Sequence, residues 1–330
     1  MRVHFTRSTI GLTLLAIALL TGVPSWSQPP AVNTDPDQAR LITSDIPNFW
    51  RAFDDGSLTN VPDLADVFQR EYLDVASPGL RDFTRFRIET ARALAEAVAE
   101  RPRFYAAIRD STLAIDRNPA VKDSIRRATR RLKALYPDAV FPDVYFLVGR
   151  LSTGGTASSA GLLIAVEMNA REPRTPIEEL SNWERATIGQ VVNLPYVVAH
   201  ELVHVQQRLR RDGSETLLTD AVAEGAADFI GELVTGDNGN RAQRRYGNSH
   251  ERALWEEFSR EMHGTDKSRW LGQGDRSIDR PADLAYYIGY KICEAFFRAA
   301  ADKTDAVRAI VQVTDADDFL RRSRYSGGNR

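Results

Sequence analysis

This chain of 330 residues has little cysteine, little net charge and no long apolar run beyond its first residues. Its one cysteine, Cys293, excludes an intramolecular disulfide, and its apolar neighbours predict a buried thiol. The formal net charge of −2 does not favour nucleic acid as a partner, and the basic residues 126–131 are interpreted as a solvated helix face. No later stretch has the roughly 20 apolar residues of a transmembrane helix.

The first residues have the pattern of an export signal. Arg2 and Arg7 precede an apolar stretch at residues 10–23, and a small-x-small cleavage site follows at 25–27. We therefore expect residues 1–27 to be a signal peptide and the mature chain to be periplasmic or secreted, without stable membrane insertion. The mature chain then has 41 of the 43 basic side chains against 45 acidic ones, a formal charge of −4. The cleavage site has no cysteine, which argues against a bacterial lipoprotein.

A pentapeptide His-Glu-Leu-Val-His, beginning at His200, reads H-E-x-x-H within an apolar stretch of helical period. Asn193 is the predicted N-cap of this helix, and Pro195 falls in its first turn, where a missing N–H costs little. The imidazoles of His200 and His204 then lie one turn apart and can bind one zinc ion with bonds of about 2.0–2.1 Å. Glu201 lies beside the metal, where a general base can move a proton from water to a leaving group.

Two histidines leave a tetrahedral zinc ion short of a third protein ligand. The metzincin pattern needs Gly and His seven and ten residues after His200, where this chain has Gln207 and Arg210, so that class is excluded. After a turn at residues 211–213, residues 214–234 are again helical in pattern. A helix over these residues can therefore run antiparallel to the first helix and bring a side chain back to the two histidines.

This second helix carries two acidic side chains on one face, Glu224 and Asp228. Glu224 follows His204 by twenty positions, enough to finish one helix, turn and bring a carboxylate back. Asp228 can accept the second N–H of a ligating histidine and fix its tautomer, and the small residues 225–227 let the two helices approach closely. The combined pattern resembles the gluzincin peptidases, which implies His200, His204 and Glu224 as zinc ligands, Glu201 as base and Asp228 as the outer partner of a ligand.

The rest of the chain divides by pattern. Residues 28–43 are rich in Pro and Asp and predict a flexible tether, and helical patterns follow over 44–136, including one helix at about 79–100. Residues 143–148 and 161–166 predict a hairpin, because Gly/Ser/Thr-rich residues separate them. We therefore predict an α+β, mostly α fold with an N-terminal helical region (44–136), a zincin-like catalytic domain with a small sheet (137–303) and a C-terminal helical tail (304–330).

Four segments outside the metal motif carry a further resemblance: residues 45–50, 72–80, 269–271 and 280–291. They look like a family of predicted zinc-dependent proteases related to the gliding-motility lipoprotein GldB, and the resemblance covers about residues 44–300. It implies a peptidase without naming its substrate, and a zincin-like fold in which an edge strand above the metal pairs with an extended peptide. The lack of a lipidated cysteine weighs against a role in motility.

Peptide hydrolysis also needs a hydrogen-bond donor for the oxyanion that develops in the transition state. Tyr286 and Tyr290 are one helical turn apart and are predicted to bring a phenol toward the zinc, with Gly289 between them allowing a close approach. Ordinary core packing is the alternative for both tyrosines. His250 and His263 are alternative donors.

These patterns favour a zinc-dependent peptidase with Zn²⁺ as cofactor and a peptide or protein as substrate. A non-catalytic zinc-binding scaffold of the cell envelope and a metallohydrolase of non-peptide bonds are the alternatives. A structural zinc site has four protein ligands and no use for a base at Glu201, which favours the enzyme. Cleavage preference and oligomeric state have no signal in the sequence.

Overall fold

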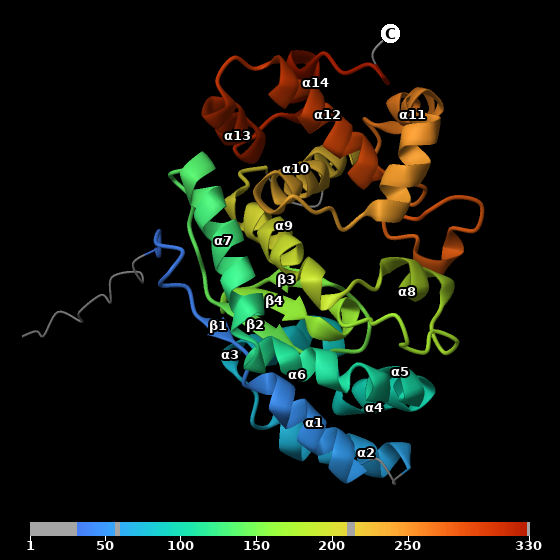
Figure 1. The fold of residues 1–330 in the computed structure, drawn as a ribbon. Coiled ribbons are helices and arrows are strands. Elements are labelled where there is room, and N and C mark those ends of the chain that lie inside the picture. The colour runs from blue at the N-terminus through green and yellow to red at the C-terminus, as the bar shows by residue number, and fades with distance from the viewer. Residues whose placement is uncertain (1–31, 57–59, 210–214, 329–330) are drawn as a thin grey trace, which may run out of the picture. The chain divides into compact units, whose positions relative to one another are not determined.

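The computed structural model describes residues 32–56, 60–209 and 215–328. The predicted signal peptide, residues 1–27, and the predicted turn at 211–213 lie outside them. The described residues are mostly helical with one small sheet, which confirms the predicted α+β, mostly α class (Figure 1).

Within the described residues, seven α-helices precede strand β2 (Val144–Leu147), and capping side chains fix several of their amino ends. Asn60, Ser77 and Thr90 each accept a hydrogen bond from a backbone N–H of the following helix. The single helix predicted at about 79–100 is wrong, because the chain turns at Glu89, where φ is +71°. The elements are α1 (Asp45–Gly56), α2 (Val61–Phe68), α3 (Pro78–Phe83), α4 (Ala91–Glu100), α5 (Pro102–Ala107), α6 (Arg109–Arg117), α7 (Pro119–Leu135) and the π-helical turns η1 (Gln69–Leu73) and η2 (Thr84–Ile88).

The sheet has the strand order β1-β2-β4-β3, and its other strands are β1 (Leu41–Ile42), β3 (Gly155–Ala157) and β4 (Leu162–Ala165). β1 and β4 both run parallel to β2, whereas β3 is antiparallel to β4. The predicted hairpin of 143–148 with 161–166 is therefore wrong: these strands are parallel neighbours, and the hairpin is β3–β4. All residues of β2 and β4 are buried, as is typical of parallel strands covered on both faces.

The predicted tether is also wrong for its described part, because residues 33–43 are bound to the fold. The Asn33 carbonyl accepts a hydrogen bond from the Phe141 N–H at 2.8 Å, and the Asn33 amide donates to the Phe141 carbonyl at the same distance. Arg40 forms an ion pair with Asp143, and β1 follows at once. The order of this segment has no signal in the sequence, because its hydrophobicity is low. Hydrogen bonds and an ion pair bind it to the fold, rather than burial of apolar side chains.

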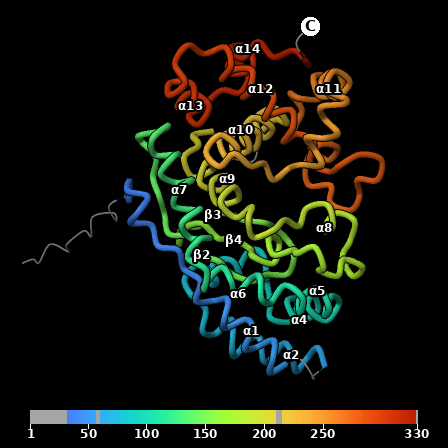
Figure 2. Tube along the Cα trace, viewed as in Figure 1, coloured from blue at the N-terminus to red at the C-terminus, as the bar shows by residue number. Residues whose placement is uncertain are grey.

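The helices after the sheet carry the predicted site. Helix α9 (Leu194–Gln206) contacts β3 and β4, and it also packs against α10 (Leu217–Thr235). Helices α1 and α3 contact the same sheet, and Figure 2 traces α1 below its strands and α9 above them. The remaining helices are α8 (Asn182–Thr187), α11 (Arg241–Glu261), α12 (Ala285–Ala299), α13 (Lys303–Val311) and α14 (Ala316–Ser323).

Helices α10 and α12 cross at two glycines, with backbone against backbone. A Cβ atom at Gly289 would lie 1.6 Å from the Ala221 carbonyl oxygen, and one at Gly225 would lie 2.0 Å from the Gly289 carbonyl carbon. Gly225 therefore allows close approach to α12, and not to α9 as its position in the sequence predicted. Contact with α9 instead uses Gly231, whose added Cβ would lie 3.1 Å from the Tyr196 ring.

We expect Gly289→Ala to lower the free energy of unfolding by about 1–3 kcal/mol or more, because the added methyl overlaps a backbone oxygen and the helices must separate. Urea denaturation at fixed metal content measures the change. Gly154→Ala is the matched control, since an added Cβ there meets no atom within 4 Å. Equal stability of the two variants would show that α10 and α12 are not packed this closely.

Candidate metal centre

Helix α9 presents the H-E-x-x-H motif to a cleft, and its amino end differs in one respect from the prediction. Pro195 lies in the first turn as expected. Asn193 holds the predicted N-cap position, but its side chain makes no capping hydrogen bond, because a 3₁₀ turn (Val191–Asn193) runs directly into α9 and gives Asn193 a helical backbone. Its side chain instead accepts a hydrogen bond from the Gln190 N–H and donates one to Asp237.

The structure brings together the three side chains predicted to bind zinc. The Nε2 atoms of His200 and His204 are 3.1 Å apart. Oε2 of Glu224 lies 3.1 Å from His204 Nε2 and 3.5 Å from His200 Nε2. Ligands about 2.0–2.1 Å from a tetrahedral zinc ion are about 3.3 Å from one another. The three atoms therefore have the spacing of three corners of a zinc coordination tetrahedron.

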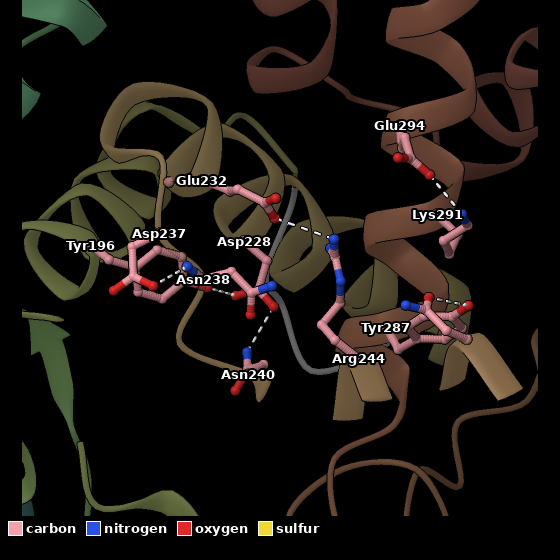
Figure 3. Close-up of polar contacts among 12 residues, drawn as sticks. Tyr196, Asp228, Glu232, Asp237, Asn238, Asn240, Arg244, Tyr287, Lys291 and Glu294 are labelled. Atoms are coloured by element: carbon pink, nitrogen blue, oxygen red, sulfur yellow. Dashed lines mark hydrogen bonds and ion pairs between the residues drawn. The ribbon is translucent and has the colours of Figure 1, made fainter. Parts of the chain in front are cut away.

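Asp228 fixes the tautomer of His200, in agreement with its predicted position. Its Oδ1 lies 2.9 Å from His200 Nδ1 and accepts the Tyr196 hydroxyl at 2.6 Å, while its Oδ2 accepts the Asn240 amide at 2.7 Å. Figure 3 shows Asn240 directed at the Asp228 carboxylate. Because Asp228 is acidic and acts as acceptor, the Nδ1 of His200 carries the proton and its Nε2 keeps a lone pair.

Gln207 fixes the tautomer of His204, a role that the H-E-x-x-H pattern alone does not predict. Oε1 of Gln207 lies 2.9 Å from His204 Nδ1, and its amide nitrogen donates to the Ala223 carbonyl at 2.6 Å. The second contact fixes which end of the amide faces the imidazole, so the Nδ1 of His204 must donate. The spacing of three residues between His204 and Gln207 is the signal that could have found it.

When the two imidazoles are neutral, their Nε2 atoms and the Oε2 atom of Glu224 each offer a lone pair. These three lone pairs converge on one point. Burial raises the pKa of Glu224, but His204 and His200 more than offset this and hold it well below its usual value, so Glu224 is a carboxylate. Burial lowers the pKa of His200, but its hydrogen bonds to Asp228 and Glu224 raise it well above normal, so a cation that binds its Nε2 must displace a proton. Such an arrangement of acceptors fits a divalent cation, and two nitrogens with one carboxylate oxygen are typical zinc donors.

Glu201 lies beside this cluster against strand β3. A Cβ atom at Gly155 would lie 2.7 Å from Glu201 Cγ and 2.8 Å from its Oε1, so only glycine lets the strand come this close. Within the described residues no hydrogen bond is made to the Glu201 carboxylate. Burial raises its pKa, and the charges of the two site histidines partly offset this. The carboxylate is therefore available as a proton acceptor.

A cleft with a volume of about 920 Å³ opens onto the cluster, and the two predicted tyrosines relate to it differently. Tyr286 lines the cleft and its ring is stacked on His200, with centroids 6.1 Å apart. Tyr290 does not line it: its ring packs against Phe229, and the Arg244 guanidinium lies 3.4 Å from the ring centroid. The prediction that Tyr290 faces the metal is therefore wrong, and core packing describes this residue.

The two histidines predicted as alternative donors to the oxyanion lie away from the cluster. The His250 ring stacks on Tyr246, and its Nδ1 lies 2.8 Å from the Tyr246 carbonyl oxygen. His263 is exposed and lies 3.4 Å from Asp317. Within the described residues, the histidines and carboxylates close enough to share a metal ion are His200, His204 and Glu224.

Replacing Asp228 by Asn is expected to lower zinc affinity by about 10–100-fold, because an amide oxygen is a weaker acceptor for the His200 N–H. Competition with a fluorescent chelator measures it. Asp237→Asn is the matched control, since Asp237 is bonded to Asn193 and Arg241 rather than to the histidines. Unchanged affinity in Asp228→Asn would mean that this carboxylate does not orient the ligand.

The described residues thus define a mostly helical α+β protein with a candidate divalent-metal site on two neighbouring helices. A family model matches residues 34–327, and the chain belongs to this family, which is described as gliding motility protein GldB. No curated protein and no solved structure matches this chain.

Membership of this lipoprotein family indicates an exported protein of the cell envelope. Among the helices of the described residues, none is both long and apolar enough to cross a bilayer.

Proposed function

We propose that this protein is a zinc-dependent peptidase that acts in the periplasm or outside the cell. The convergence of three lone-pair donors at the spacing of a zinc tetrahedron, beside an open cleft, is the observation that carries the proposal. His200, His204 and Glu224 hold the metal, and Asp228 and Gln207 orient the two imidazoles.

The remaining side chains of the site have chemical tasks that suit hydrolysis. A bound zinc ion lowers the pKa of a water molecule to about 7 and polarises a carbonyl group. Glu201 accepts the proton of the attacking water, and burial, which raises its pKa, helps it to pass that proton to the leaving amine. Tyr286 lines the cleft beside His200 and donates to the oxyanion, and burial keeps its pKa well above normal, so the phenol stays protonated.

Strand β3 supports a peptide as the substrate. It lies at the end of the strand order and pairs with β4, and residues 152–157 line the cleft beside Glu201. An extended peptide can add to such an edge by backbone hydrogen bonds, which places its carbonyl groups near the metal site. Three protein donors leave a coordination position for water or substrate, whereas a structural zinc site has four.

Two measurements on the purified mature protein test the proposal: zinc content by mass spectrometry, and cleavage of a peptide library before and after treatment with a chelator. We expect one zinc per chain and cleavage that disappears with the metal and returns when zinc is added. Bound zinc without cleavage would favour the scaffold, and hydrolysis of ester or amide substrates but not of peptides would favour the other metallohydrolase. A protein that binds no zinc would overturn the proposal.

Tyr286→Phe is expected to reduce kcat by about 10²–10³-fold with little change in KM, because the phenol donates only as charge develops on the oxyanion. Tyr290→Phe is the matched control one turn along α12, since its ring contacts Phe229 and Arg244 instead of the cleft. Tyr290→Phe should lower the stability of the fold and leave kcat unchanged. A normal kcat for Tyr286→Phe would remove this residue from the catalytic site.

A further inference from the structure

Arg87 is a partly buried arginine that lines the cleft, and its side chain forms no hydrogen bond or ion pair within the described residues. Two other arginines line the same cleft. Arg241 is neutralised by Asp237 at 2.8 Å, and Arg171 donates to the Arg185 carbonyl at 3.2 Å. The guanidinium of Arg87 is therefore the one among them with neither an acidic nor a backbone acceptor. A guanidinium at a cleft that has no protein acceptor can pair with an anionic group of a ligand.

The backbone of Arg87 is tied to the loop that leads into strand β3. Its carbonyl accepts hydrogen bonds from Arg150 Nε at 2.7 Å and from the Ser152 hydroxyl at 3.4 Å. Arg87 and Glu201 both line the cleft. Arg87 thus lies at the Gly155 end of β3.

The direction of β3 defines which end of a bound peptide meets Arg87. Antiparallel pairing is the more stable arrangement of two strands. A peptide antiparallel to β3, which runs from Gly155 to Ala157, points its carboxyl end toward Gly155 and the loop held by Arg87. The residues that follow the cleaved bond therefore lie on the Arg87 side of the cleft.

We propose that Arg87 binds a carboxylate of the substrate on the carboxyl-terminal side of the cleaved bond. This inference rests on the proposed peptidase function. The guanidinium presents several N–H donors in a planar fork that matches a carboxylate. That carboxylate is either the free end of a short peptide or an Asp or Glu side chain. Arg87 is then a specificity-determining residue, because it contacts the substrate away from the reacting atoms.

Binding is measured by fluorescence anisotropy with the zinc-loaded Glu201→Gln protein, so that bound peptides are not cleaved. Four pools of labelled random heptapeptides are compared: neutral pools with a free or an amidated carboxyl end, and amidated pools enriched in Glu or in Gln. We expect carboxylate pools to bind about 10–100-fold more tightly than their neutral partners. A preference for the free end identifies a terminal carboxylate, and a preference for Glu identifies a side chain.

The second arm introduces Arg87→Gln, Arg87→Lys, Arg85→Gln and Arg171→Gln, each into the same protein. Arg87→Gln should abolish the preference for carboxylate, and Arg87→Lys should restore part of it. Arg85→Gln is the matched control and should change nothing, because Arg85 is exposed and lies over Phe86 outside the cleft lining. Loss of the preference in Arg171→Gln, but not in Arg87→Gln, would overturn the assignment.

Cleavage of the same pools by the wild type separates this inference from the proposed function. Cleavage without a carboxylate preference, or equal binding of all pools, overturns the role of Arg87 alone. Carboxylate-selective binding that Arg87→Gln abolishes, without any cleavage, supports Arg87 as a carboxylate site and overturns the peptidase.

Discussion

Glu201→Gln is expected to retain its zinc and to lose peptide hydrolysis by about a hundredfold or more. Glu201 is not among the three converging donors, so the metal should stay bound. The amide fills the same space beside Gly155 but cannot accept the proton of the attacking water, which removes general-base catalysis. Zinc content and kcat, measured on the same preparation, test both parts.

A matched acidic control separates this loss from a general effect of removing charge. Glu232→Gln is suitable, because Glu232 lies on α10 and pairs with Arg244 at 3.3 Å rather than with the cleft (Figure 3). It should keep normal kcat. Full activity in Glu201→Gln with zinc retained would end the proposed mechanism.

Glu224→Ala should have the largest effect on metal binding. It leaves only two imidazoles, so we expect zinc affinity to fall by more than the about 10–100-fold that loss of an outer partner costs. Competition against chelators of graded affinity measures the dissociation constant. Activity should fall in parallel and should recover only in part at high zinc concentration.

Asp220→Ala provides the control for this helix. Asp220 lies one turn before Glu224 and forms an ion pair with Lys267 at 2.6 Å, so its removal should leave zinc binding unchanged. Undiminished zinc in Glu224→Ala would move the third ligand elsewhere.

The cluster could be predicted because local helical geometry defines most of it. His200 and His204 are one turn apart, and twenty residues between His204 and Glu224 suffice for an antiparallel return. The structure brings these side chains together as the spacing predicted, while their binding of zinc stays a prediction. Gln207 was missed, although its three-residue spacing from His204 placed it on the same face.

Local geometry fails where the neighbouring element is distant in the sequence. Tyr290 lies about 6 Å along the axis of α12 from Tyr286, far enough to pass the end of the cleft and meet Arg244 of α11. Gly225 is similar: a helix has several faces, and the sequence does not say that this one meets α12. Long-range packing, not helical period, decides both cases.

The strand order could not be predicted for a related reason. β3 consists of Gly, Thr and Ala within a Gly/Ser/Thr-rich stretch, so it has the composition of a turn. Its residues have low β-propensity, so its extended conformation depends on pairing with β4 and on the close contact of Gly155 with Glu201. Tertiary contacts therefore override local preference at the strand that borders the cleft.

The length of β3 also limits how long a peptide can stay bound. An antiparallel partner for a strand of three residues forms about two or three backbone hydrogen bonds, worth about 1–4 kcal/mol in all. Binding of this size alone corresponds to dissociation constants of about millimolar or weaker. Cleaved products that keep only these bonds leave quickly, so we expect the residence time of a substrate to be set by its side chains.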